Sequence, residues 1–118
     1  DFKVAGAHAA GAALLDGSDR PDALFVASGL MVLGVLQAMQ ERGLRAGRDL
    51  GLVAFDDTPW TRLLDPPLSV IAQPVREVGR TAARLLLDRL RSGQENRPAR
   101  TVTLGTELVV RASSRRDA

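Results

Sequence analysis

The stretch that most constrains the fold spans residues 51–74, because it holds an apolar run that stops abruptly at two acidic residues. Leu52 to Phe55 shows no alternation of apolar and polar residues, which is typical of a parallel strand covered on both faces. Asp56 and Asp57 follow, and two carboxylates cannot continue a buried strand without partners. Ligands of open α/β sheets bind at the carboxyl ends of the strands. The pattern therefore predicts an α/β fold with a ligand site near Asp56.

The rest of the chain alternates helices with short apolar runs, as a parallel sheet flanked by helices requires. We expect helices over residues 4–15, 30–39 and 75–91, a helical turn over 60–64, and strands over 23–27, 52–55, 68–72, 101–104 and 107–110. Ser28 is expected to cap the helix that starts at Leu30, a contact worth about 1 kcal/mol.

The helix expected over residues 30–39 is apolar almost all round, with Gln37 its only polar residue. A helix at the surface of a monomer normally has a polar face. We therefore expect two apolar partners for this helix. One is the sheet, and the other is a second subunit or another part of the same protein.

The basic residues do not indicate a nucleic-acid surface, although the sequence pI is about 10.3. The formal net charge is only +2, and all but one of the 16 basic residues are arginine. Arg76, Arg80 and Arg84 recur at four-residue spacing and are interpreted as a solvated helix face. Arg115-Arg116 is interpreted as a solvated tail.

Several functional classes find little support in the sequence. The chain has no cysteine, no apolar run of about 18 residues and no signal peptide, which fits a cytoplasmic protein and no membrane partner. It also lacks glycine-rich phosphate loops and a GxSxG motif, and its one histidine, His8, is expected to pack between helices. We expect no enzyme activity, no cofactor and no metal site.

A binding site requires fewer specific side chains than a catalytic site. Asp56 could accept two hydrogen bonds from vicinal hydroxyls or from an amine, and Ser28 and Gln73 offer further polar contacts. Trp60 or Phe55 could supply an apolar wall. The alternative is that Asp56 forms a turn or caps a helix, and the turn-forming alternative is stronger for Asp57, which precedes Thr58-Pro59.

The order and spacing of several short motifs resemble the effector-binding domain of the LacI/GalR (lac repressor) family of bacterial transcriptional regulators. The resemblance spans nearly the whole chain. Its motifs are Ala27-Ser28-Gly29-Leu30-Met31 with Gly34, Phe55-Asp56-Asp57, Pro66-Pro67-Leu68, Gln73-Pro74 before a helix with Gly79, and Thr106-Glu107-Leu108-Val109-Val110-Arg111.

The resemblance implies a fragment of a periplasmic-binding-protein-like type I fold, in which two α/β lobes are joined by crossovers. Residues 1–70 would form much of the C-terminal lobe, and residues 71–100 the crossover and a helix of the N-terminal lobe. Residues 101–112 would be return strands, and residues 113–118 a disordered tail. The DNA-binding headpiece, most of the N-terminal lobe and the opening strand of the C-terminal lobe would lie outside this chain, which suggests an excerpt.

The resemblance also implies a small effector, commonly a sugar or nucleobase, that binds between the lobes, and a homodimer that reads operator DNA through the absent headpiece. Asp56 matches the family's effector-contacting aspartate, and the full set of predicted effector residues is Asp56, Ser28, Gln73, Phe55, Trp60 and Val75. The implied dimer residues are Leu30, Leu33, Leu36, Leu63 and Leu64. Ser28 stands where the family usually has asparagine, and Gly29 stands where it usually has aspartate. The alternative function is a solute-binding protein of a sugar transporter, which shares the fold.

Overall fold

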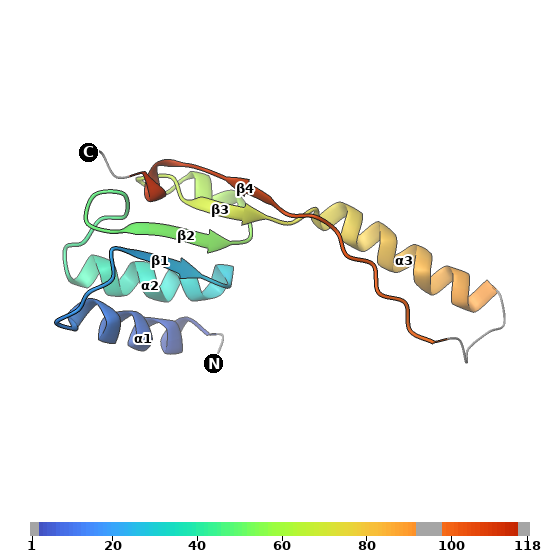
Figure 1. Ribbon diagram of the computed structural model, residues 1–118, viewed down its shortest axis with the longest axis horizontal. Coiled ribbons are helices and arrows are strands. Elements are labelled where there is room, and N and C mark those ends of the chain that lie inside the picture. The colour runs from blue at the N-terminus through green and yellow to red at the C-terminus, as the bar shows by residue number, and fades with distance from the viewer. Residues whose placement is uncertain (1–2, 92–97, 116–118) are drawn as a thin grey trace. The chain divides into compact units, whose positions relative to one another are not determined.

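The computed structural model describes residues 3–91 and 98–115 and has an α/β fold, as predicted (Figure 1). Its sheet has the strand order β1-β2-β3-β4. The first three strands run parallel and β4 is antiparallel to β3. The strands are β1 (Ala23–Val26), β2 (Gly51–Phe55), β3 (Ser69–Ala72) and β4 (Glu107–Val109).

The helices agree with the sequence prediction to within about two residues at most ends. They are α1 (Val4–Asp16), α2 (Gly29–Glu41) and α3 (Val75–Arg91), with short 3₁₀ helices η1 (Pro59–Arg62) and η2 (Ala112–Ser114). The prolines explain several of the ends, because Pro59 opens η1 and Pro74 precedes α3. The strands and helices that flank the acidic residues were therefore predicted from local patterns.

The chain divides into two compact units. Unit 1 comprises the described parts of residues 1–72 and 107–118, and unit 2 comprises those of residues 73–106. The hydrophobic core lies in unit 1, where its fully buried large side chains are Met39, Leu50, Leu52, Leu68, Val32 and Val70. The described part of unit 2 consists of Gln73, Pro74, α3 and the chain segment 98–106.

Helices α1 and α2 lie in close contact at Gly34 of α2 (Figure 1). A Cβ atom added at Gly34 would lie 2.6 Å from the backbone nitrogen of His8 and would also clash with the carbonyl oxygen of Val4. Helix α1 is therefore part of the second apolar partner of α2. Leu30 and Leu33 are exposed, so α1 does not cover all of the apolar surface of α2.

The two faces of the sheet are buried to different extents. Val26, Ala54 and Val70 are paired across the sheet and are all buried, since they share the face on which the core lies. On the opposite face, Phe25 is 56% exposed and Leu108 is 59% exposed. The sequence predicts that both faces of the sheet are covered. Within the described residues, only the face that carries the core is covered.

Two predictions about the C-terminal part are wrong. Residues 101–104 form no strand, because within the described chain they run beside α3, with which they line a common cavity, and pair with no strand. The tail predicted from residue 113 begins too early, since Ser113 is fully buried in η2. Its hydroxyl accepts a hydrogen bond from Ser69 N (2.7 Å) and donates one to Leu52 O (2.7 Å). Residues 116–118 lie outside the described residues.

Helix α3 has the predicted amphipathic pattern, but its apolar stripe is exposed. Val75 is 72% exposed and Leu90 is 66% exposed, and Thr81 is the one residue of the helix that is buried. Arg76, Arg80 and Arg84 are exposed as well. Tertiary packing normally supplies most of the stability of such a helix, so the exposed stripe is suited to contact with further protein.

Candidate functional site

Three polar side chains follow the carboxyl ends of neighbouring parallel strands. Ser28 follows β1, Asp56 follows β2 and Gln73 follows β3. The apolar runs end there because a charged or amide side chain cannot enter the buried sheet unpaired. The edge formed by these strand ends is where open α/β sheets bind ligands.

Asp56 has an unusual backbone conformation that places it at this edge. Its φ is +80°, the only positive φ among the described residues other than glycine. Aspartate tolerates this region better than most residues because its short polar side chain can hydrogen-bond locally. The Asp56 amide donates a hydrogen bond to Ile71 O on β3 (3.0 Å), which fixes the turn out of the sheet.

The start of α2 faces the Asp56 carboxylate. A Cβ atom added at Gly29 would lie 4.0 Å from Asp56 Oδ2, an ordinary van der Waals distance, so the start of α2 lies directly beside this carboxylate. Ser28 occupies the N-cap position, but its hydroxyl makes no cap hydrogen bond, and the predicted capping role is wrong. The first backbone hydrogen bond of the helix runs from Val32 N to Ser28 O (3.2 Å).

Asp57 is held in a network of hydrogen bonds and ion pairs rather than in a simple turn. Its carboxylate accepts hydrogen bonds from Thr61 Oγ1 (2.8 Å), Arg62 Nη2 (2.8 Å) and Arg111 Nη2 (2.9 Å). Burial raises the pKa of this carboxyl, but those hydrogen bonds and the charge of Arg111 outweigh burial and lower the pKa to about 2. Asp57 is therefore ionised at every physiological pH.

Sequence reasoning did not identify Arg111 or Thr61 as members of this site. Arg111 is 54 residues from Asp57 in sequence, so no local pattern connects the two. The only signal was the inclusion of Arg111 in the C-terminal motif of the family resemblance. Thr61 carried no signal, although it is almost completely buried.

The remaining predicted effector residues fall in both units. Phe55 and Trp60 belong to unit 1 and are half-buried, and Trp60 packs against the core. Gln73 and Val75 belong to unit 2, where Val75 N donates a hydrogen bond to Gln73 O (2.9 Å). The side chain of Val75 is exposed at the start of α3.

The predicted dimer residues all belong to unit 1 and differ in exposure. Leu30 is 61% exposed, Leu33 is 42% exposed and Leu63 is 84% exposed. Leu36 and Leu64 are half-buried and line one cavity of about 450 Å³ between the end of α2 and the loop after η1.

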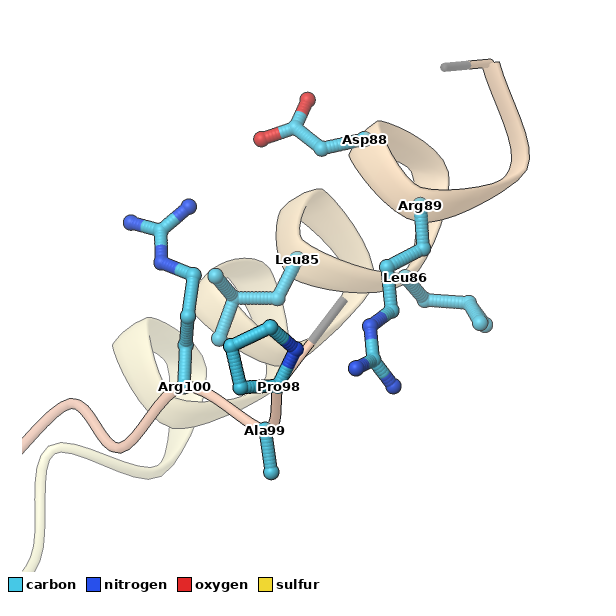
Figure 2. A pocket seen from close by; sticks show the side chains of 7 residues that line it. All are labelled: Leu85, Leu86, Asp88, Arg89, Pro98, Ala99 and Arg100. Atoms are coloured by element: carbon cyan, nitrogen blue, oxygen red, sulfur yellow. The ribbon is translucent and has the colours of Figure 1, made fainter. Parts of the chain in front are cut away.

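The other cavities contain few of the predicted residues. Figure 2 shows one of about 270 Å³ in unit 2, where Leu85 of α3 lies beside Pro98. Among residues 3–91 and 98–115, no cluster of three acidic or histidine side chains could hold a metal ion. No helix in the described part of the chain is long and apolar enough to cross a membrane.

Comparison with known proteins places this chain in a family. Residues 2–114 match the periplasmic binding protein-like domain. The chain is 42% identical over 100 residues to the ribose operon repressor of Haemophilus influenzae, covering 85% of this chain and 30% of that protein. This relative is named as a repressor and not as an enzyme.

Two solved structures show the same fold. A LacI family transcriptional regulator from Arthrobacter sp. FB24, in complex with lactose, is 36% identical, with a TM-score of 0.77 over 95% of this chain and 41% of that one. The lac repressor dimer bound to operator and an anti-inducer is 32% identical, with a TM-score of 0.80 over 98% of this chain and 39% of that one. The chain thus spans about a third of the length of its relatives. It belongs to the family of periplasmic binding protein-like domains and, within that family, to the branch found in LacI-family regulators.

Proposed function

We propose that this chain is the effector-binding and dimerisation part of a bacterial transcriptional regulator that acts in the cytoplasm. The observation that carries the proposal is the position of Asp56, which follows the carboxyl end of β2 and whose carboxylate lies next to Gly29 at the start of α2. The names of the relatives favour a regulator over the solute-binding protein of a transporter.

The effector class that we propose is a sugar or a related polyhydroxylated metabolite. An ionised carboxylate accepts hydrogen bonds only, and two vicinal hydroxyl groups can donate one to each of its oxygens. One relative is named as a ribose operon repressor, and one structure holds lactose. Because Ser28 and Gly29 replace the asparagine and aspartate usual in the family, we expect fewer polar contacts to the effector at the start of α2.

The assignment of chain segments to the two lobes follows the two compact units. We propose that residues 1–70 belong to the C-terminal lobe, that residues 71–100 cross to the N-terminal lobe, and that the chain returns by residue 112. The two compact units, which change at residues 72–73 and 106–107, support this assignment. The exposed apolar stripe of α3 fits a helix whose packing partners belong to the remainder of that lobe.

DNA binding would depend on a headpiece outside this chain. Binding of an effector between the lobes would favour one angle between them, and the dimer would transmit that angle to the spacing of the headpieces. Allosteric coupling of this kind is typically about 1–3 kcal/mol. Operator affinity would therefore change by roughly 5- to 150-fold when the effector binds.

The carboxylate is best tested with asparagine, since asparagine tolerates a positive φ whereas alanine does not. Asp56→Asn in the full-length gene product should weaken the response to D-ribose and lactose, because the variant keeps the turn and loses the charge. The measurement is the rise in melting temperature with each sugar. A ligand at a hundred times its dissociation constant stabilises the native protein by about 2.7 kcal/mol. An equal rise for Asp56→Asn and for the wild type would return Asp56 to a turn-forming role, provided that both proteins bind operator equally.

The proposed dimer face is tested separately by Leu33→Arg. Leu33 is 42% exposed, so an arginine there should be tolerated in a monomer but would bury an unpaired charge in a dimer. We expect sedimentation velocity to show a dimer for the wild type and a monomer for the variant. Leu14→Arg on α1, where the leucine is 51% exposed and no dimer role is assigned, is the matched control and should leave the dimer intact. A dimer that survives Leu33→Arg would refute this interface.

A further inference from the structure

A nearly buried arginine joins the C-terminal return of the chain to the acidic pair at the end of β2. The side chains of Arg111 and Asp57 are 14% and 12% exposed. Arg111 Nη2 donates hydrogen bonds to both Asp57 carboxylate oxygens, each over 2.9 Å. Asp57 has no role in the effector contacts proposed above.

The second nitrogen of the same guanidinium group makes two further contacts. Arg111 Nη1 donates to Leu68 O (2.9 Å), just before β3, and to Thr61 Oγ1 (3.1 Å) in η1. One planar group thus binds the end of β2, the 3₁₀ helix and the start of β3 at once. A guanidinium has enough donors in a fixed plane for this arrangement, whereas an ammonium group lacks that geometry.

These contacts bear on Asp56 because it is the residue before Asp57. The φ of +80° at Asp56 is unfavourable for a residue with a side chain and persists only where the surroundings enforce it. On one side, the Asp56 amide is bound to Ile71 O. On the other side, the carboxylate of Asp57 is clamped by Arg111, so the chain is fixed on both sides of the strained residue.

Both constraints involve the return of the chain through β4. Ile71, which accepts the Asp56 hydrogen bond, is paired with Leu108 of β4. Arg111 follows β4 by two residues, and β4 begins at the residue after unit 2 ends. The placement of Asp56 is therefore linked to the seating of β4, the strand through which the chain returns from unit 2.

We propose that Arg111 is a positioning residue for Asp56, and that through it the seating of β4 sets the orientation of the effector-binding carboxylate. The proposal rests on the proposed function for its consequence in effector binding. Its structural part concerns only the backbone at Asp56 and can be measured without an effector. The two parts can therefore fail separately.

The first arm of the test measures amide hydrogen exchange in the full-length gene product. In Arg111→Gln, the Asp56 amide should exchange about tenfold faster or more, the size expected from loss of one charge-assisted hydrogen bond. The Gly51 amide, which donates to Asp22 O (2.8 Å) at the other end of β2, is the internal reference. Equal acceleration at Asp56 and Gly51 would show general destabilisation and overturn the positioning role, as would no acceleration at Asp56.

The matched control is Arg62→Gln. Arg62 also binds the Asp57 carboxylate, at 2.8 Å, but its side chain is 68% exposed. We expect Asp56 exchange within about twofold of wild type for this variant. If Arg111→Gln does not fold, Arg111→Lys keeps the charge without the planar contacts and should accelerate exchange at Asp56 in the same direction, to a smaller extent.

The second arm measures the dissociation constant for D-ribose by calorimetry. Arg111→Lys should bind D-ribose about tenfold more weakly than wild type, while Arg62→Gln binds normally. An unchanged dissociation constant for Arg111→Lys would overturn the proposed link to effector binding. Failure of the wild-type protein to bind D-ribose would count against the effector assignment instead, and the exchange rates decide the positioning role in either case.

Discussion

Replacement of Gly34 by alanine should force α1 away from α2. The added methyl group would lie 2.6 Å from the backbone nitrogen of His8 and 3.1 Å from the Cβ of Ala7, and would clash with Val4 O. Two of these three atoms belong to the α1 backbone, which cannot rotate aside as a flexible side chain can. The interface must therefore open, in a region where Ala7 is buried.

Two opposing effects set the size of the change. Overpacking of a core typically destabilises by about 1–3 kcal/mol, and the rigid backbone at this contact favours the upper part of that range. Alanine is a better helix former than glycine by about 1 kcal/mol, which offsets part of the loss. The ion pair of His8 with Glu41 across the same helices is exposed and adds little. We therefore expect a net destabilisation of about 1–2 kcal/mol.

Gly11→Ala is the matched control, because Gly11 lies on α1 opposite α2. A Cβ atom there would lie 3.6 Å from the Cβ of Ala38 and 3.6 Å from two atoms of Val35, which is ordinary van der Waals contact. The gain in helix propensity should leave this variant as stable as wild type, or up to about 1 kcal/mol more stable. Urea unfolding followed by far-ultraviolet circular dichroism gives both values. Destabilisation of both variants by the same amount, or of neither, would refute this description of the interface.

Two other substitutions test the polar contacts of unit 1. Ser113→Ala should destabilise the protein by roughly 2–4 kcal/mol in urea unfolding, because it leaves the buried Ser69 N–H and Leu52 C=O without this partner. The control is Ser28→Ala, which should change stability little because the Ser28 hydroxyl makes no cap hydrogen bond. The pKa of Asp57 is about 2 in the folded protein against an ordinary 3.8, which contributes about 2 kcal/mol to the free energy of unfolding. This contribution is fully present above about pH 4 and is lost as the pH falls towards 2. In acid unfolding, Asp57→Asn should therefore show a smaller loss of stability over this pH range.

The strands and helices of unit 1 could be predicted because each is encoded locally. An unalternating apolar run such as Leu52 to Phe55 suits a strand of a parallel sheet, and prolines mark where the chain must turn. The predicted strand over residues 101–104 failed for the opposite reason. A strand exists only when a neighbouring strand pairs with it, and the propensity of Thr101, Val102 and Thr103 cannot supply that partner.

The acidic pair was predicted only in part. The sequence places Asp56 and Asp57 at a strand end, and the two residues were distinguished by the turn residues after Asp57. The positive φ of Asp56 and the network around Asp57 depend on Ile71 and Arg111, which are distant in sequence. Long-range contacts of this kind leave no periodicity, and the same holds for Ser113, whose burial follows from its hydrogen bonds to the sheet.

The charges around the acidic pair favour a neutral effector over a cationic one. Asp57 is ionised, and its charge is balanced by the ion pair with Arg111. The exposed side chain of Arg62 brings a second positive charge to the same carboxylate. The two carboxylates and the two guanidinium groups together carry no net charge, so the field at Asp56 is weaker than that of an isolated acidic pair. A cation would gain little from entering such a site, whereas hydroxyl groups need only the accepting oxygens of Asp56. If Arg111 positions Asp56 as proposed, the same arginine therefore also restricts the kind of effector that Asp56 can bind.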